Sequence, residues 1–109
     1  MDISIIIPSF NTRDLLDRCL SSIFSSLKQS NLISEVIVVD NASNDGTRKL
    51  LSQKYPRVIT ILNRENVGYG KANNQGIRMA KGEYILLLNS DIQVIDEAID
   101  KLLHVAKQH

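Results

Sequence analysis

The chain has 109 residues, of which 43% are hydrophobic and 23% are charged, a composition that fits an ordinary globular domain and excludes a disordered or collagen-like chain. This length accommodates one domain and leaves no room for two. The 13 Lys and Arg residues and 12 Asp and Glu residues give a net charge of +1 without a long run of either sign, so nothing favours a nucleic-acid partner.

Four apolar, β-branched segments predict strands, at residues 3–7, 35–39, 58–62 and 84–88. The first, second and fourth are nearly continuous apolar runs, which are typical of strands covered on both faces of a sheet. The third segment is more mixed, so we expect it nearer an edge. Residues 8–11 are expected to form the segment that follows the first strand.

A helical pattern follows each predicted strand. Apolar residues at helical spacing between positions 15 and 27 predict an amphipathic helix, with Asn11 or Thr12 as its N-cap. A short helix carrying Leu50 and Leu51 follows the second strand. The apolar residues expected to pack from the last two helices are Ala72, Ile77, Met79 and Ala80 on the third, and Ile95, Ile99, Leu102, Leu103 and Ala106 on the fourth.

Strands and helices that alternate at this spacing predict a doubly wound α/β fold, a three-layer α/β/α arrangement around a parallel sheet. We expect the strand order 3-2-1-4, with the chain reversing direction between strands 1 and 4. In such sheets the ligand crevice lies outside the carboxyl ends of the strands at that reversal. Polar clusters follow three of the strands there, at residues 8–11, 40–41 and 89–91.

Neither common glycine-rich phosphate motif is present. The turn after the first strand has no glycine, and Gly68-Tyr69-Gly70 lacks the third glycine of a dinucleotide fingerprint. A divalent cation would then have to neutralise any diphosphate, and Asp91, just beyond the fourth strand, is the candidate ligand. A turn or helix-capping role is the alternative for Asp91 and for Asp40, because the S-N-D-G-T segment beyond Asp40 signals a turn and a cap.

Four segments resemble successive motifs of the family 2 glycosyltransferases. They are residues 4–11 (SIIIPSFN), 38–47 (VVDNASNDGT), 66–76 (NVGYGKANNQG) and 82–91 (GEYILLLNSD). Asn-Val-Gly before the third helix and Asn-x-Asp after the fourth strand resemble the rhamnosyltransferase-like branch. The resemblance implies a GT-A fold and transfer of a sugar, with inversion, from a nucleoside-diphosphate sugar to an acceptor hydroxyl.

The resemblance also assigns roles by position. The segment Pro8, Ser9, Phe10 and Asn11 matches the lining of the base and ribose pocket, and Asp40 matches a carboxylate that hydrogen-bonds the base. The residues matching the loop and helix start that close over the nucleotide are Asn66, Gly68 and Asn73. The turn Asn89, Ser90 and Asp91 matches an Asp-x-Asp motif in which the last carboxylate binds manganese or magnesium.

Asn89 departs from that motif, so one negative charge is missing and we expect weaker metal binding. The implied donor is a UDP-, GDP- or dTDP-sugar, and the acceptor, a glycan or lipid-linked sugar of a cell-envelope polysaccharide, is left open. The family's general base is expected downstream of His109. Asp96 and Asp100 are interpreted as first-turn and exposed positions on the last helix rather than as that base.

We therefore expect residues 1–109 to form the donor-binding, N-terminal half of a GT-A domain, without its acceptor-binding part. An unpaired strand edge and uncovered apolar surface then predict a homo-oligomer. Without a long apolar segment, the expected location is cytoplasmic or peripheral at the inner face of the membrane. Cys19 is expected to be buried, and His104 and His109 to be solvated.

Two alternatives remain open at this point. The first is a non-catalytic nucleotide-binding or interaction module of the same fold. The second is a flavodoxin-like α/β domain with another ligand.

Overall fold

Four parallel strands form one sheet in the order β3-β2-β1-β4, as predicted. The computed structural model describes residues 1–108, and His109 lies outside the described residues. The strands are β1 (Ile3–Ser9), β2 (Ser34–Asp40), β3 (Ile59–Leu62) and β4 (Tyr84–Leu87). In the central pairings Ile6 lies beside Ile37 of β2 and Leu87 of β4.

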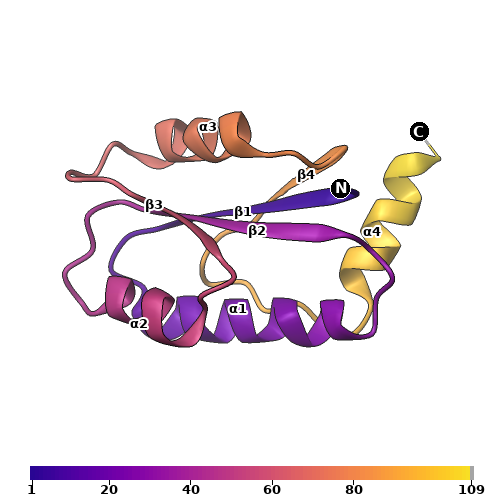
Figure 1. Ribbon diagram of the computed structural model, residues 1–109, viewed down its shortest axis with the longest axis horizontal. Coiled ribbons are helices and arrows are strands. Elements are labelled where there is room, and N and C mark those ends of the chain that lie inside the picture. Colours follow the sequence, from indigo (N-terminus) through magenta and orange to yellow (C-terminus); the bar gives the residue numbers. More distant parts are fainter. Residues whose placement is uncertain (109) are drawn as a thin grey trace.

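Helices cover both faces of the sheet, which confirms the three-layer arrangement. They are α1 (Arg13–Lys28), α2 (Thr47–Lys54), α3 (Tyr69–Met79) and α4 (Ala98–Lys107). Figure 1 shows α1 and α2 below the sheet and α3 above it, with α4 beside the end of the sheet where β1 begins. None of the helices among residues 1–108 is long and apolar enough to cross a bilayer.

The alternating side chains of β1 divide the core into two clusters. Ile5 and its same-face neighbours on β1 pack with Leu20 and other buried residues of α1, whereas Ile6 packs with Ala72 of α3 on the opposite face. Cys19 is fully buried within the first cluster, as predicted. Both faces of the central strands are therefore dry, which explains the nearly continuous apolar sequences of β1 and β2.

The fourth strand is not covered on both faces, and the prediction for residues 84–88 was wrong in this respect. Ile85 and Leu87 are 43% and 44% exposed. Both lie at a sheet edge, and α3 packs over β1 and β2 rather than over β4. The expected uncovered apolar edge is present here. Residues 58–62, the more mixed segment, include β3, which forms the other edge of the sheet, as predicted.

The packing predicted for the last two helices is only partly correct. On α3 the buried residues are Ala72, Asn73 and Gly76, while Ile77 and Met79 are exposed. A Cβ atom on Gly76 would lie 2.5 Å from Ile6 Cγ2, so α3 approaches the sheet too closely for larger side chains.

On α4 only Ile99 and Leu103 are buried, and Leu102 is 53% exposed. Ile95, predicted to belong to this helix, precedes its start at Ala98 and is 71% exposed. This helix contacts α1 along a narrow stripe, which leaves its remaining apolar side chains in solvent.

The first strand continues through Pro8 to Ser9, two residues further than expected. Pro8 pairs with Val39 of β2, but the pairing with β4 ends at Ile6. Beyond Ile6, β1 has a neighbour on one side only, and a strand tolerates proline where such a ladder bond is not needed.

Candidate functional site

The predicted polar clusters meet at one end of the sheet. Ser9 and Asp40 lie side by side at the carboxyl ends of β1 and β2. The loops that follow β1, β2 and β3 gather at the left of the view in Figure 1. Hydrogen bonds join the loop after β1 to the loop after β2 and to the turn after β4, so this end of the sheet is one connected polar site.

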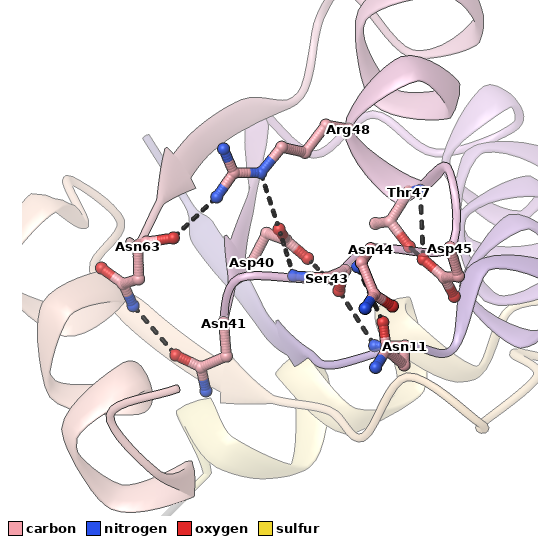
Figure 2. Close-up of polar contacts among 9 residues, drawn as sticks. All are labelled: Asn11, Asp40, Asn41, Ser43, Asn44, Asp45, Thr47, Arg48 and Asn63. Atoms are coloured by element: carbon pink, nitrogen blue, oxygen red, sulfur yellow. Dashed lines mark hydrogen bonds and ion pairs between the residues drawn. The ribbon is translucent and has the colours of Figure 1, made fainter. Parts of the chain in front are cut away.

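Asp40 is a fully buried carboxylate that holds the loop after β2 (Figure 2). Its Oδ1 accepts a 2.5 Å hydrogen bond from Ser43 Oγ, and its Oδ2 accepts from the Ser43 N–H at 3.2 Å. Arg48 Nε, from α2, lies 3.3 Å from Oδ2, and the same guanidinium donates to the Asn63 carbonyl. The carboxylate therefore organises the site from inside, and its direct contact with a base stays a prediction.

Asn11 connects the loop after β1 to the loop after β2. Its N–H donates to Ser43 Oγ and its Oδ1 accepts from the Asn44 N–H, both at 2.9 Å. Asn11 has a φ of 51°, in the left-handed region where asparagine is tolerated better than most residues. This backbone turn and the two hydrogen bonds hold Asn11 against Ser43 and Asn44, as Figure 2 shows.

Asp45 caps two helices at once. Its Oδ2 accepts from the Arg13 N–H at the start of α1, and its Oδ1 accepts from the N–H and hydroxyl of Thr47 at the start of α2. Burial alone would raise the pKa of Asp45, but these hydrogen bonds outweigh it and lower the pKa. Thr12 occupies the N-cap position, as predicted, but it makes no side-chain cap bond. The bond to the Arg13 N–H comes instead from Asp45, 32 residues further along the chain.

An amide network fixes the loop between β3 and α3. Asn63 Nδ2 donates to Asn41 Oδ1 at 2.9 Å, and Asn63 and Gln75 form a reciprocal pair through both of their amide groups. Asn41 Oδ1 also accepts from the Val67 N–H at 3.4 Å. These contacts position the segment that leads into Gly68, whose φ of 88° favours glycine.

Two hydroxyl groups hold the turn after β4. Thr12 Oγ1 lies 2.9 Å from Ser90 Oγ and 3.2 Å from Ser9 Oγ, which links this turn to the end of β1. From the other side the Tyr69 hydroxyl donates to Asn89 Oδ1 at 2.7 Å. The exposed side chain of Asp91 makes no hydrogen bond or ion pair within residues 1–108, so the turn presents a free carboxylate.

The remaining predicted residues differ in exposure. Pro8 is buried, whereas Phe10 is 47% exposed. Asn66 Oδ1 accepts from the Gly68 N–H at 2.9 Å and so shapes the entry to α3. Asn73 is 6% exposed, and its Oδ1 is a buried acceptor without a hydrogen-bond partner among the described residues.

Protein side chains alone do not form a metal cage. Within residues 1–108 no group of three or more His, Cys, Asp or Glu side chains lies close enough to hold an ion. The prediction for Asp96 and Asp100 is only partly correct. Asp100 is in the first turn of α4 but is half-buried and accepts from Ser30 Oγ at 2.6 Å, and Asp96 precedes that helix. His104 is exposed near the end of α4, as predicted.

Two hollows of the surface lie away from this site. One of about 560 Å³ runs along the serine-rich side of α1, and one of about 730 Å³ lies between α1, α2 and the start of β2. A shallower hollow of about 300 Å³ adjoins Asn11 and Asp45. The site is defined by its polar residues, and we call the surface between their loops, at the carboxyl ends of β1 and β4, the crevice.

Sequence reasoning missed several residues that shape this site. They are Arg48, Asn63, Gln75 and Tyr69, which all contact predicted residues or their loops. Asn63 directly follows β3, as polar residues follow the other strands, whereas Arg48, Gln75 and Tyr69 lie in helices. The only available signal was the number of amide side chains in and around the third motif.

Comparison with known proteins gives consistent matches across the chain. A family model described as "Glycosyl transferase family 2" matches residues 4–109. The poly(ribitol-phosphate) beta-glucosyltransferase of Bacillus spizizenii is 36% identical over 113 residues, which cover 100% of this chain and 18% of that protein.

Two solved structures have the same fold. The S. aureus TarS crystal structure matches with a TM-score of 0.84 and 23% identity, covering 100% of this chain and 20% of TarS. The mannosyltransferase PcManGT from Pyrobaculum calidifontis, solved with GDP-Man and Mn²⁺, matches with a TM-score of 0.76 and 28% identity, covering 96% of this chain and 31% of that one. The chain thus spans less than half the length of each relative.

Proposed function

Because the chain belongs to glycosyltransferase family 2, we propose that it forms the donor-binding part of an enzyme that transfers a sugar from a nucleoside-diphosphate sugar with inversion. The observation that supports this most is the turn after β4, where two hydroxyl contacts hold Asn89 and Ser90 and leave the Asp91 carboxylate free. The flavodoxin-like alternative does not account for the family match. Because of its Asn-Val-Gly and Asn-x-Asp segments, we propose that the chain belongs to the rhamnosyltransferase-like branch of this family.

Asp91 is the proposed ligand of a divalent cation. Manganese and magnesium ions bound with substrate phosphates need only one or two protein carboxylates, and water and phosphate oxygens complete their coordination. A single exposed carboxylate without a protein partner fits that requirement. When bound, the cation would stabilise negative charge on the departing diphosphate. The PcManGT structure with GDP-Man and Mn²⁺ supports this choice of ligand class.

The nucleoside is proposed to occupy the crevice beside Ser9, Phe10 and Asn11, with Asn66, Gly68 and Asn73 on the α3 side. The half-exposed ring of Phe10 offers an apolar surface to a base or ribose. Asp40 would accept a hydrogen bond from an N–H group of the base in place of one of the bonds that it now accepts from Ser43 or Arg48. UDP-, GDP- and dTDP-sugars all remain candidates.

The acceptor is proposed to be a hydroxyl group of a cell-envelope polymer or lipid-linked sugar. The name of the Bacillus spizizenii relative supports a polymer acceptor. A general base must remove the proton of that hydroxyl as the new bond forms. We propose that this base belongs to an acceptor-binding part beyond His109, since Asp100 is engaged by Ser30 within the α1–α4 contact.

Thermal unfolding with ligands tests the donor site. UDP, GDP or dTDP at ten times its Kd, with Mn²⁺, should stabilise the folded chain by about 1.4 kcal/mol and raise Tm by roughly 5–10 °C. Asp91→Ala should remove the metal-dependent part of this shift. Glu83→Ala, an exposed carboxylate at the opposite end of β4, is the matched control and should keep it.

The absence of a shift with all three nucleoside diphosphates would contradict the proposal. A hydrolysis assay with radiolabelled donor then separates a transferase from a non-catalytic binding module. Slow release of sugar to water requires the proposed metal site but no acceptor, so a module without chemistry would bind the donor and leave it intact.

A further inference from the structure

The Tyr69 side chain links α3 to the turn after β4 across the crevice. Tyr69 is the first residue of α3, and its ring is 53% exposed. Its hydroxyl nevertheless donates to Asn89 Oδ1 at 2.7 Å, a contact between residues 20 positions apart. Asn89 occupies the first position of the Asn-x-Asp turn, so this contact acts directly on a residue of the proposed donor site.

The contact determines which group Asn89 presents to a ligand. An asparagine amide can offer either its carbonyl oxygen as an acceptor or its NH₂ group as a donor of two hydrogen bonds. Here Oδ1 already accepts from Tyr69, and the backbone carbonyl of Asn89 accepts from the Ile92 N–H. The Nδ2 group has no partner within residues 1–108, so both of its N–H donors are available to a ligand, while one of the two acceptor positions of Oδ1 is used by Tyr69.

A carboxylate at position 89 would behave differently. It would also accept from Tyr69, but its second oxygen would be an additional acceptor carrying negative charge. Such a group attracts cations and repels phosphate, whereas the NH₂ group of Asn89 can donate to a ligand oxygen. Asp91 is then the one charged side chain among residues 89–91. The hydrogen bond donated by Asn89 partly replaces the attraction for the ligand that a second carboxylate would provide through a bound cation.

We propose that Tyr69 is a positioning residue that holds the Asn89 amide with its NH₂ group toward the crevice, where it donates to an acceptor oxygen of a nucleoside diphosphate. The inference rests on the proposed donor-binding function and adds that the Asn89 NH₂ group is a hydrogen-bond donor to the nucleotide. The site then binds nucleoside diphosphate with less dependence on metal than a site with carboxylates at both positions.

The test measures nucleoside-diphosphate affinity by calorimetry, with and without Mn²⁺, for Tyr69→Phe, Asn89→Ala, the double variant and Asn89→Asp. Loss of one ligand hydrogen bond should weaken metal-free binding about threefold to tenfold in Tyr69→Phe and in Asn89→Ala. The double variant should be no weaker than Asn89→Ala, because Tyr69 acts through Asn89. Asn89→Asp should weaken metal-free binding and increase the gain from Mn²⁺.

Tyr84→Phe provides the matched control, since that ring lies in β4 away from the turn and its hydroxyl makes no hydrogen bond within residues 1–108. Inorganic pyrophosphate distinguishes the two possible acceptors. An effect of Tyr69→Phe on pyrophosphate binding assigns the acceptor to a phosphate, whereas an effect limited to the nucleotide assigns it to the ribose.

Two results would overturn the inference while leaving the proposed function intact. The first is a Tyr69→Phe variant that binds the nucleotide as tightly as the wild type does. The second is a Tyr69→Phe substitution that lowers nucleotide affinity by the same factor in the wild type and in the Asn89→Ala variant. Failure of the wild-type chain to bind any of the three nucleoside diphosphates would instead remove the proposed function and this inference with it.

Discussion

Asp40→Asn is the substitution for which the structure predicts the largest loss of stability at the site. The side chain is fully buried and accepts three hydrogen bonds, from the hydroxyl and N–H of Ser43 and from Arg48. Asparagine has nearly the same shape, and its Oδ1 can still accept from the Ser43 hydroxyl. Its NH₂ group would replace Oδ2, so it would face the Ser43 N–H and the Arg48 guanidinium, two donors to which it cannot bond.

The expected cost follows from the two contacts that Oδ2 loses. A neutral hydrogen bond contributes about 0.5–1.5 kcal/mol and one to a charged group about 1.5–3 kcal/mol. Because the Arg48 side chain is 45% exposed, it can turn toward water, and the loss should fall in the lower half of the summed range. We expect about 2–3 kcal/mol, which corresponds to a fall in Tm of roughly 10–20 °C for a domain of this size.

Urea unfolding followed by far-UV circular dichroism measures this difference, since the chain contains no tryptophan. Asp14→Asn is the control. Its side chain is 82% exposed and pairs with Arg13 at the surface, so the change should be within about 0.5 kcal/mol. An Arg48→Met background should reduce the cost of Asp40→Asn by about 1 kcal/mol. An Asp40→Asn chain as stable as the Asp14→Asn control would refute the assigned role of the buried carboxylate.

Further predictions concern packing, chemistry and assembly. Gly76→Ala should destabilise the fold by about 1–3 kcal/mol in urea, because its methyl group would overlap the Ile6 side chain, whereas Gly70→Ala, with open space around it, should be neutral or slightly stabilising. Burial raises the pKa of the Cys19 thiol to about 11, so iodoacetamide at pH 8 should label it only after unfolding, and rapid labelling of the native chain would contradict its burial. Hydrogen bonds from Lys54 and Tyr55 lower the pKa of Asp17 below its ordinary value near 4, so its contribution to stability is complete above that value and is lost as the pH falls through the folded-state pKa; Asp17→Asn should flatten this part of the pH profile measured by urea unfolding. The open edge of β4 predicts self-association, so light scattering should show the mean mass rising with concentration, and a constant monomer mass would exclude it.

The sequence by itself determined the sheet and the place of the site. Runs of β-branched residues and the helical spacing between them depend on local geometry, so they predicted four strands, four helices and the order 3-2-1-4. The carboxyl ends of parallel strands share one end of the sheet, so the order of strands and loops predicts that Asp40 and Asp91 lie at that same end.

Only the tertiary structure decided which of these side chains is free. Asp40 ends β2 and Asp91 lies in the turn after β4, yet Asp40 is enclosed by Ser43 and Arg48 while Asp91 has no partner within residues 1–108. The cap from Asp45 to α1 and the contact of Tyr69 with Asn89 join loops far apart in the sequence. Such contacts depend on how closely helices approach the sheet and which edge stays open, and no local pattern of residues encodes those distances.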